Sequence, residues 1–208
     1  MIDLQAYSVI GFDLDNTLFD QTEYEFAIFR KIAQKVEALY ALDENIYFNA
    51  LKKLYNIGEK EHTFDKALQM CLPDLPENWE EVMVSTVLEL YRNYVPTTLT
   101  PFLDVIPILN SLKEGNSRLV LITNGRVKTQ NSKIDKLGIR DYFDLILISD
   151  SYSPSRRKPD VTMFQDALEY FNIPAHSMIY IGDDLLRDKA SEKIGVDFIH
   201  IDKLIYEK

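Results

Sequence analysis

The sequence predicts an α/β protein in which a five-stranded parallel sheet carries helices on both faces and an all-helical segment interrupts the chain after the first strand. Two patterns lead to this prediction. From about residue 103 onward, short apolar runs alternate with helical patterns, an order typical of a parallel sheet covered by helices. Between residues 22 and 94, apolar residues instead recur at spacings of three and four, which indicates helices alone.

The helical segment shows its pattern most clearly in three sets of apolar positions. These are Phe26, Phe29, Ile32, Ala33, Val36, Leu39 and Tyr40, then Phe64, Ala67, Leu68, Cys71 and Leu72, and finally Trp79, Val82, Met83, Thr86, Leu90 and Tyr94. A shorter helical stretch stops near Gly58, and Pro96 and Pro101 mark a linker. We therefore expect a helical cap domain over residues 20–95 and an α/β core domain over residues 1–19 and 96–208.

The core elements follow one another in a regular order. Strands are expected at residues 7–12, 118–123, 143–149, 178–182 and 196–201, and helices at 103–113, through Ile134 and Leu137, at 163–171 and at 185–194. Gly115 and Gly138 are placed to end two of these helices. The helical domain enters and leaves at the carboxyl edge of the predicted sheet, so we expect it to act as a lid over that edge, although an additional packed layer is the alternative.

Composition narrows the classes of partner and compartment. The formal net charge of −10 opposes binding to nucleic acid polymers or anionic membranes. No apolar run approaches the roughly 18 to 20 residues of a membrane span, and the amino-terminal residues lack the pattern of a secretory leader. The single cysteine, Cys71, suits a reducing compartment. We expect a cytoplasmic protein that acts on a small molecule.

The first strand ends in two aspartates, Asp13 and Asp15. Two carboxylates at the end of a buried strand repel each other and lose hydration, so a bound cation or a shared proton is the expected compensation. Ligands of open α/β sheets bind at this edge. An ordinary solvated turn rich in aspartate and asparagine is the alternative interpretation.

Polar residues also follow the other strands. The second strand ends in Thr123, Asn124 and Gly125, which could receive an anion at the start of the next helix, although they also suit a plain turn. The third leads to the basic cluster Arg156, Arg157 and Lys158, and surface charges at a loop tip are the alternative there. The fourth is followed by three acids, which could also be simple helix caps: Asp183, Asp184 and Asp188.

Taken in order, these residues resemble the four motifs of the haloacid dehalogenase (HAD) superfamily. The matching motifs are Asp13-x-Asp15-x-Thr17, Thr123 at a strand end, Lys158-Pro159, and Gly182-Asp183-Asp184 with Asp188. The resemblance covers the whole chain, because the helical segment is similar to the C1-type cap of subfamily I. It implies a Rossmann-like core with strand order 5-4-1-2-3.

The resemblance also implies a role for each motif residue. Asp13 would be the nucleophile that forms an aspartyl-phosphate, and Asp15 the general acid and base. Thr123, Asn124 and Gly125 would bind phosphate oxygens, and Lys158 would neutralise negative charge. Mg²⁺ would be bound by the Asp13 carboxylate, the Asp15 backbone carbonyl and Asp183, with Asp188 assisting.

The second aspartate of the first motif favours phosphatase over dehalogenase chemistry, because only an alcohol leaving group needs a proton. The expected function is thus Mg²⁺-dependent hydrolysis of a small phosphomonoester. The Thr-Asn-Gly turn and residues 139–144 resemble the pyrimidine 5'-nucleotidase and phosphoglycolate phosphatase branches. A sugar phosphomutase and a non-catalytic HAD-fold binding protein are the alternatives. The roles of Asp184, Arg156 and Arg157, the oligomeric state and the substrate stay open.

Overall fold

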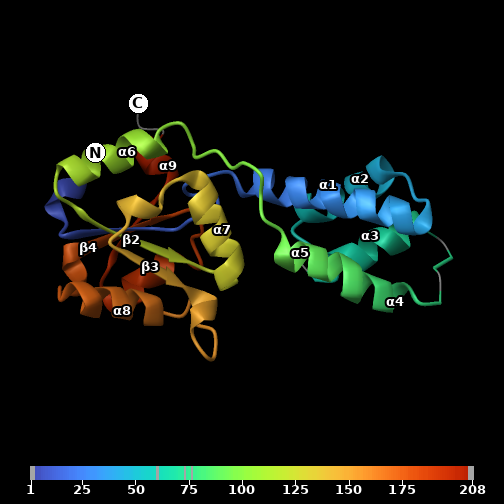
Figure 1. Ribbon diagram of the computed structural model, residues 1–208. Coiled ribbons are helices and arrows are strands. Elements are labelled where there is room, and N and C mark those ends of the chain that lie inside the picture. Colours follow the sequence, from blue (N-terminus) through green and yellow to red (C-terminus); the bar gives the residue numbers. More distant parts are fainter. Residues whose placement is uncertain (1–2, 60, 73, 76, 206–208) are drawn as a thin grey trace. The chain divides into compact units, whose positions relative to one another are not determined.

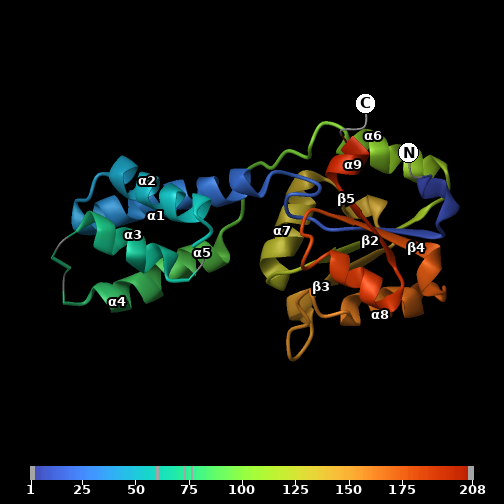
Figure 2. The ribbon, with the colours of Figure 1, turned by 180° about the vertical axis from the view of Figure 1, so that it is seen from behind.

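The computed structural model describes residues 3–59, 61–72, 74–75 and 77–205. The chain forms two compact units, one made of Met1–Gln21 with Thr97–Lys208 and the other of Thr22–Pro96 (Figures 1 and 2). Each unit has its own buried core, so the two are described in turn.

The first unit is built on a five-stranded sheet in the order β3-β2-β1-β4-β5, with every neighbouring pair parallel. The strands are β1 (Val9–Phe12), β2 (Arg118–Thr123), β3 (Leu145–Ile148), β4 (Met178–Gly182) and β5 (Asp197–His200). This order is the predicted one, read from the opposite edge, so the predicted fold class is confirmed. The first strand is central, and the residues that follow it lie beside the ends of β2 and β4.

Helices cover both faces of this sheet. The longer ones are α6 (Val105–Glu114), α7 (Val127–Leu137) and α8 (Thr162–Phe171). The chain steps from β1 to β2 to β3 through α6 and α7 and then crosses back to β4 through α8, so right-handed connections put α8 on the opposite face from α6 and α7. Figures 1 and 2 show this arrangement.

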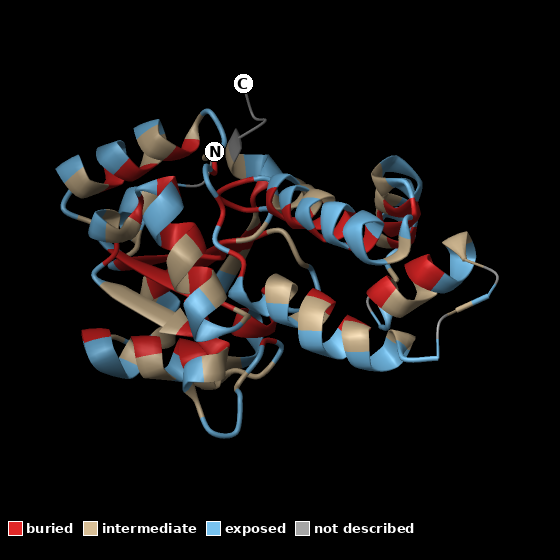
Figure 3. Cartoon of the chain, turned by 45° about the vertical axis from the view of Figure 1, so that its right-hand side comes forward, coloured by how far each residue is buried: buried red, intermediate tan, exposed pale blue. Residues whose placement is uncertain are grey.

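The core on the α8 face shows why the strands are apolar on both sides. Met163, Phe164 and Ala167 of α8 pack with side chains of β1, β2 and β4, and Figure 3 shows how burial concentrates along the strands. Gly11 of β1 belongs to this packing. A Cβ atom there would come within 2.7 Å of the Tyr180 ring, because that ring fills the space beside it.

The second unit is entirely helical within its described residues. Its elements are α1 (Gln21–Tyr40), α2 (Glu44–Asn56), α3 (Thr63–Cys71), α4 (Trp79–Val82), the π-helical segment η2 (Met83–Leu88) and α5 (Glu89–Asn93). Aromatic side chains join these helices, with Phe29 edge-on to Phe64 and Tyr24 edge-on to Tyr94. The tyrosine and phenylalanine content of this segment therefore serves its core.

The structure departs from the sequence prediction after β4. A regular helix over 185–194 is wrong, because the chain first makes a turn and then the 3-10 segment η6 (Lys189–Ile194). Asp184 explains the turn, since its side chain accepts hydrogen bonds from the backbone N–H groups of Leu186 and Arg187.

Short elements complete the described chain. They are η1 (Leu4–Ala6), η3 (Arg140–Tyr142), η4 (Ser149–Ser151), η5 (Ala175–Ser177) and α9 (Asp202–Ile205). Among the described helices, none combines the length and the apolar character needed to cross a membrane.

Candidate active site

The candidate site lies at the carboxyl edge of the three central strands. Asp13 directly follows β1, Thr123 ends β2, and Asp183 directly follows β4. Because β1 lies between β2 and β4, these residues share one edge of the sheet. The Asp13 N–H donates to the Ile181 carbonyl at 2.8 Å, which continues the β1–β4 ladder by one residue and fixes the backbone of Asp13.

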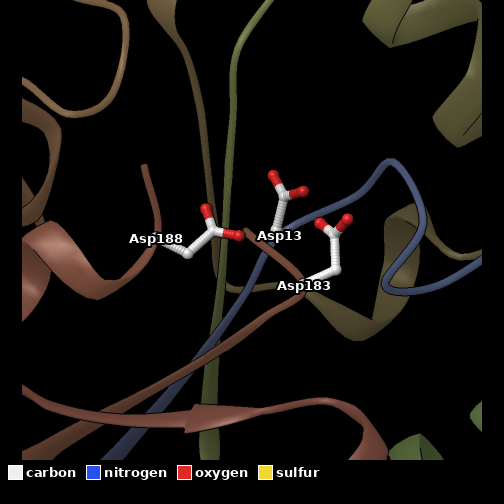
Figure 4. A group of neighbouring side chains, drawn as sticks. All are labelled: Asp13, Asp183 and Asp188. Carbon is white, nitrogen blue, oxygen red and sulfur yellow. The ribbon is translucent and has the colours of Figure 1, made fainter. Parts of the chain in front are cut away.

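Three carboxylates meet at this edge (Figure 4). One oxygen each of Asp13, Asp183 and Asp188 lies within 4.8 Å of the others, a group that could hold a metal ion. Asp13 and Asp188 are almost fully buried, with 7% and 1% of their surface exposed. The side chains therefore come from two strand ends and from the turn after β4.

Lys158 is the cation beside them. Its Nζ lies within hydrogen-bonding distance of four oxygens, which share its three N–H groups: Asp13 Oδ1 at 2.7 Å, Asp188 Oδ1 at 2.6 Å, the Ile122 carbonyl at 3.0 Å and the Tyr180 hydroxyl at 2.8 Å. Tyr180 in turn donates to the Ile122 carbonyl at 2.7 Å. The buried ammonium is thus held by two carboxylates and two neutral oxygens.

The electrostatics of the cluster call for a further positive charge. The pKa of Asp13 is raised to about 8, chiefly by burial and also by the nearby carboxylates of Asp188 and Asp15, against the opposing effect of Lys158. Burial and then Asp188 also raise the pKa of Asp183. Burial opposes the charged form of Lys158, but Asp13 and Asp188 outweigh it and raise the pKa of its ammonium. Three carboxylates facing one lysine leave excess negative charge that a divalent cation with oxygen ligands fits well.

Asp188 owes its position to a glycine. A Cβ atom on Gly182 would lie 2.3 Å from Asp188 Oδ2, so only glycine leaves room for this carboxylate against the end of β4. Asp188 Oδ2 also accepts from the backbone N–H of Asp184 at 3.0 Å. Asp184 itself organises the turn. Burial alone would raise the pKa of its carboxyl, but the hydrogen bonds from the N–H groups of Arg187 and Leu186 outweigh burial and lower this pKa.

Asp15 lies apart from the three-carboxylate group and has its own partners. Lys133 Nζ donates to its Oδ1 at 2.7 Å, and Gln130 Nε2 donates to its Oδ2 at 2.9 Å. The same Gln130 nitrogen donates to Thr123 Oγ1 at 2.7 Å. Sequence reasoning missed both α7 residues. The available signal was their place among the buried positions of that helix, where polar residues are unusual.

The other two residues of the turn after β2 are engaged within the protein. Asn124 Oδ1 accepts from the Lys158 N–H at 2.8 Å, and Asn124 Nδ2 donates to the Lys158 carbonyl at 3.0 Å. The Gly125 N–H donates to Ser149 Oγ at 3.0 Å. These bonds make Asn124 and Gly125 anchors of the Lys158 loop, whereas the Thr123 hydroxyl has Gln130 as its partner.

The basic cluster divides into the buried Lys158, the half-buried Arg156 and the exposed Arg157. Arg157 makes two hydrogen bonds to Asp150, at 2.9 and 2.7 Å, and holds the pKa of that carboxyl well below its ordinary value. Arg156 Nη1 lies 3.7 Å from Asp160 Oδ2. Both arginines thus tie down the loop that carries Lys158.

The turn after β1 is shaped by Asn16. This residue has a φ of 58°, in the left-handed region that asparagine tolerates well, and its Oδ1 accepts from the Gln21 N–H at 3.1 Å. The neighbouring Thr17 is fully buried, and within the described chain its hydroxyl has no hydrogen-bond partner. Thr17 therefore contributes packing.

The fold and the site together define a Rossmann-like protein with a helical insertion and a buried acidic site at the carboxyl edge of its sheet. Comparison with known proteins agrees. The family model described as haloacid dehalogenase-like hydrolase matches residues 10–201. The chain belongs to this family, which confirms the predicted family and the prediction of a hydrolase.

Individual relatives match over most of the chain. A glyceraldehyde 3-phosphate phosphatase from Pyrococcus abyssi is 33% identical over 187 residues, 86% of this chain and 74% of that protein. A phosphoglycolate phosphatase from Neisseria gonorrhoeae is 32% identical over 206 residues, 94% of this chain and 82% of that protein. The crystal structure of a HAD phosphatase from Thermococcus onnurineus covers 92% of this chain and 84% of its own, with a TM-score of 0.62 and 20% identity, which supports the fold alone.

Proposed function

We propose that this hydrolase is a Mg²⁺-dependent phosphatase that cleaves a small phosphomonoester through an aspartyl-phosphate. The observation that carries the proposal is the contact of buried Asp13 with Lys158 beside Asp183 and Asp188. This contact brings a buried carboxylate, the proposed nucleophile, together with a cation and two more carboxylates at one edge of the sheet. The relatives with phosphatase names support the same activity.

The residues divide the reaction between them. In the first step an Asp13 oxygen bonds to phosphorus, the ester P–O bond breaks, and Asp15 gives its proton to the departing alkoxide. In the second, Asp15 takes a proton from water, the water oxygen bonds to phosphorus, and the Asp13–phosphorus bond breaks. Lys158 and the Thr123 hydroxyl stabilise the negative charge on the phosphoryl oxygens.

Mg²⁺ is the cation that the donor set fits best. The Asp13, Asp183 and Asp188 side chains offer only carboxylate oxygens, which are hard ligands, and the buried negative charge exceeds what Lys158 supplies. Asp13 and Asp183 would bind the ion directly, and Asp188, which also holds Lys158, would assist. When bound, the ion would neutralise charge on the phosphate.

The substrate class proposed is a small phosphorylated metabolite, in keeping with the names of the relatives. The helical unit is proposed to act as the cap that selects among such esters, because it is inserted directly after the turn that carries Asp15. A cytoplasmic location stays a prediction.

Purified protein assayed with p-nitrophenyl phosphate, D-glyceraldehyde 3-phosphate, phosphoglycolate and a pyrimidine nucleoside 5'-monophosphate tests the proposal. We expect phosphate release with Mg²⁺, loss of activity with EDTA, recovery on adding Mg²⁺ back, and no activity in Asp13→Asn. Failure of the wild type on the whole panel would favour a binding protein. Conversion of a sugar 1-phosphate to its 6-phosphate without phosphate release would favour a mutase.

A further inference from the structure

We propose that Lys133 and Gln130 of α7 are positioning residues that hold Asp15 for proton transfer and couple it to the phosphate-binding Thr123. This inference rests on the proposed function, because Asp15 is the general acid and base only in a phosphatase. It assigns a task in the reaction to two buried polar residues of a helix outside the four motifs.

Both carboxylate oxygens of Asp15 accept hydrogen bonds from side chains of α7. Lys133 contacts Oδ1 at 2.7 Å and Gln130 contacts Oδ2 at 2.9 Å, so the carboxylate plane is fixed by two donors. The Lys133 side chain is only 4% exposed, and that of Asp15 is 18% exposed. Lysine is seldom buried so deeply unless it is paired, and this pairing keeps a partly accessible acid in place at the site edge.

Gln130 carries the coupling to Thr123. It is 1% exposed, and its single Nε2 donates both to Asp15 and to Thr123 Oγ1. Because Oγ1 accepts this bond, the Thr123 hydroxyl hydrogen remains to be donated elsewhere, as a phosphate oxygen requires. Any movement of the Gln130 amide would therefore change the general acid and the phosphate contact together.

The turn after β2 is built around Gln130. A Cβ atom on Gly125, whose φ is +149°, would come within 2.9 Å of the Gln130 side-chain carbon Cδ. Glycine at this position lets the turn close onto the amide. On α7 itself, Lys133 lies three residues after Gln130 on the buried face that also carries Ile134 and Leu137. The helix thus presents both donors from a rigid, packed element.

The inference predicts an effect that depends on the leaving group. An alkyl phosphate needs a proton from Asp15 when its ester bond breaks, whereas p-nitrophenolate departs without one. Water attack in the second step needs Asp15 for both esters. kcat/KM depends only on the steps up to the departure of the alcohol, so it excludes the attack of water. Both esters share the same phosphate contacts, so a loss of kcat/KM that is larger for the alkyl ester reports the proton donated by Asp15.

The first experiment compares Lys133→Met with Lys136→Met in the full chain with Mg²⁺. Lys136 is an exposed residue of the same helix, so it is a matched control. For Lys133→Met we expect kcat/KM to fall about 10- to 100-fold with phosphoglycolate or D-glyceraldehyde 3-phosphate, and by less than about threefold with p-nitrophenyl phosphate. On p-nitrophenyl phosphate, kcat should fall and a burst of p-nitrophenol should appear, because the phosphoenzyme accumulates. Lys136→Met should match the wild type.

Three further comparisons keep the test independent of folding. Lys133→Arg retains a positive charge and should recover part of the alkyl-ester activity. Gln130→Leu, compared with Gln165→Leu at an exposed position of α8, should weaken both esters, because it also releases Thr123. In an Asp15→Asn background, Lys133→Met should cause no further loss of kcat/KM with the alkyl ester, since the two residues act on one step.

Equal losses of kcat/KM for both esters in Lys133→Met, or additive losses with Asp15→Asn, would overturn the inference and leave a purely structural ion pair. If Lys133→Met melts below the assay temperature, an Arg variant that folds but loses kcat/KM equally with both esters would also overturn it. These outcomes are distinct from failure of the proposed function, in which the wild type itself would hydrolyse neither ester.

Discussion

Replacement of Gly182 by alanine tests whether the site depends on close contact between a strand end and a carboxylate. The new Cβ would lie 2.3 Å from Oδ2 and 2.5 Å from Cγ of Asp188. The obstruction is a carboxylate that is itself hydrogen-bonded, so the Asp188 side chain would have to leave its place. Asp188 would then lose Lys158 Nζ at 2.6 Å and the Asp184 N–H at 3.0 Å.

The magnitude follows from the burial of this pair. Asp188 and Lys158 side chains are each 2% exposed, and removing one partner of a buried ion pair costs about 3–5 kcal/mol, with the lower end expected here because Lys158 keeps its contact with Asp13. We expect Gly182→Ala to lower the free energy of unfolding of the α/β unit by about that amount and to weaken Mg²⁺ binding. Activity should fall with it, since the displaced carboxylate no longer assists at the proposed metal site.

Hydrogen exchange of the β1 and β4 amides in urea reports on the α/β unit, while fluorescence of the single tryptophan, Trp79, reports on the helical unit. The control is Gly115→Ala, where a Cβ would meet its nearest neighbours at 3.4 Å, an ordinary contact. Trp79 fluorescence should be unchanged in both variants. A Gly182→Ala protein as stable as the control, with the Mg²⁺ affinity of the wild type, would refute the reasoning.

Three further perturbations address neighbouring groups. Tyr180→Phe keeps the ring but removes the hydroxyl that accepts from Lys158, so urea unfolding should show a loss of about 1.5–3 kcal/mol, and an unchanged midpoint would contradict this. The pKa of Asp13 is raised to about 8 without metal, chiefly by burial, and Mg²⁺ binds only the ionised carboxylate. Calorimetry should therefore show that Mg²⁺ binding releases a proton below about pH 8 and that the Mg²⁺ affinity rises as the pH approaches this value. A Mg²⁺ affinity that does not change with pH would count against this assignment. Arg157 lowers the pKa of Asp150, so their pair stabilises the protein above the ordinary carboxyl pKa and less as pH falls below about 4. Since Arg157 is 57% exposed, Arg157→Gln should cost under about 1 kcal/mol at pH 7, and its difference from the wild type should shrink on acidification.

The sheet could be predicted from the sequence because its strands are short apolar runs with clear ends. Residues 118–123 and 178–182 were predicted with the bounds that β2 and β4 have. The turn after β4 could not be predicted from the sequence, because its apolar and charged residues also suit a helix. Its conformation is decided by Asp184, whose side chain competes for backbone N–H groups that a helix would use otherwise.

The residues at the site differ in how far the sequence reveals them. Asp13, Lys158 and Asp183 stand directly at strand ends or in ordered motifs, so their meeting at one edge follows from the topology. Gln130 and Lys133 are visible only as polar residues in the buried stripe of α7. Which strand end that stripe faces depends on the register and packing of the helix, and spacing alone does not give this.

The paired hydrogen bonds between Asn124 and the backbone of Lys158 have a consequence for how the protein tolerates change in length. The Asn124 side-chain amide bonds to both the N–H and the carbonyl of Lys158, as the backbone of a neighbouring strand would do. Arg157 and Asp150 close the loop just before Lys158. These contacts fix the position of Lys158 without help from the loop tip between Tyr152 and Ser155. Insertions at that tip should therefore lengthen the loop outward and leave the ammonium in place.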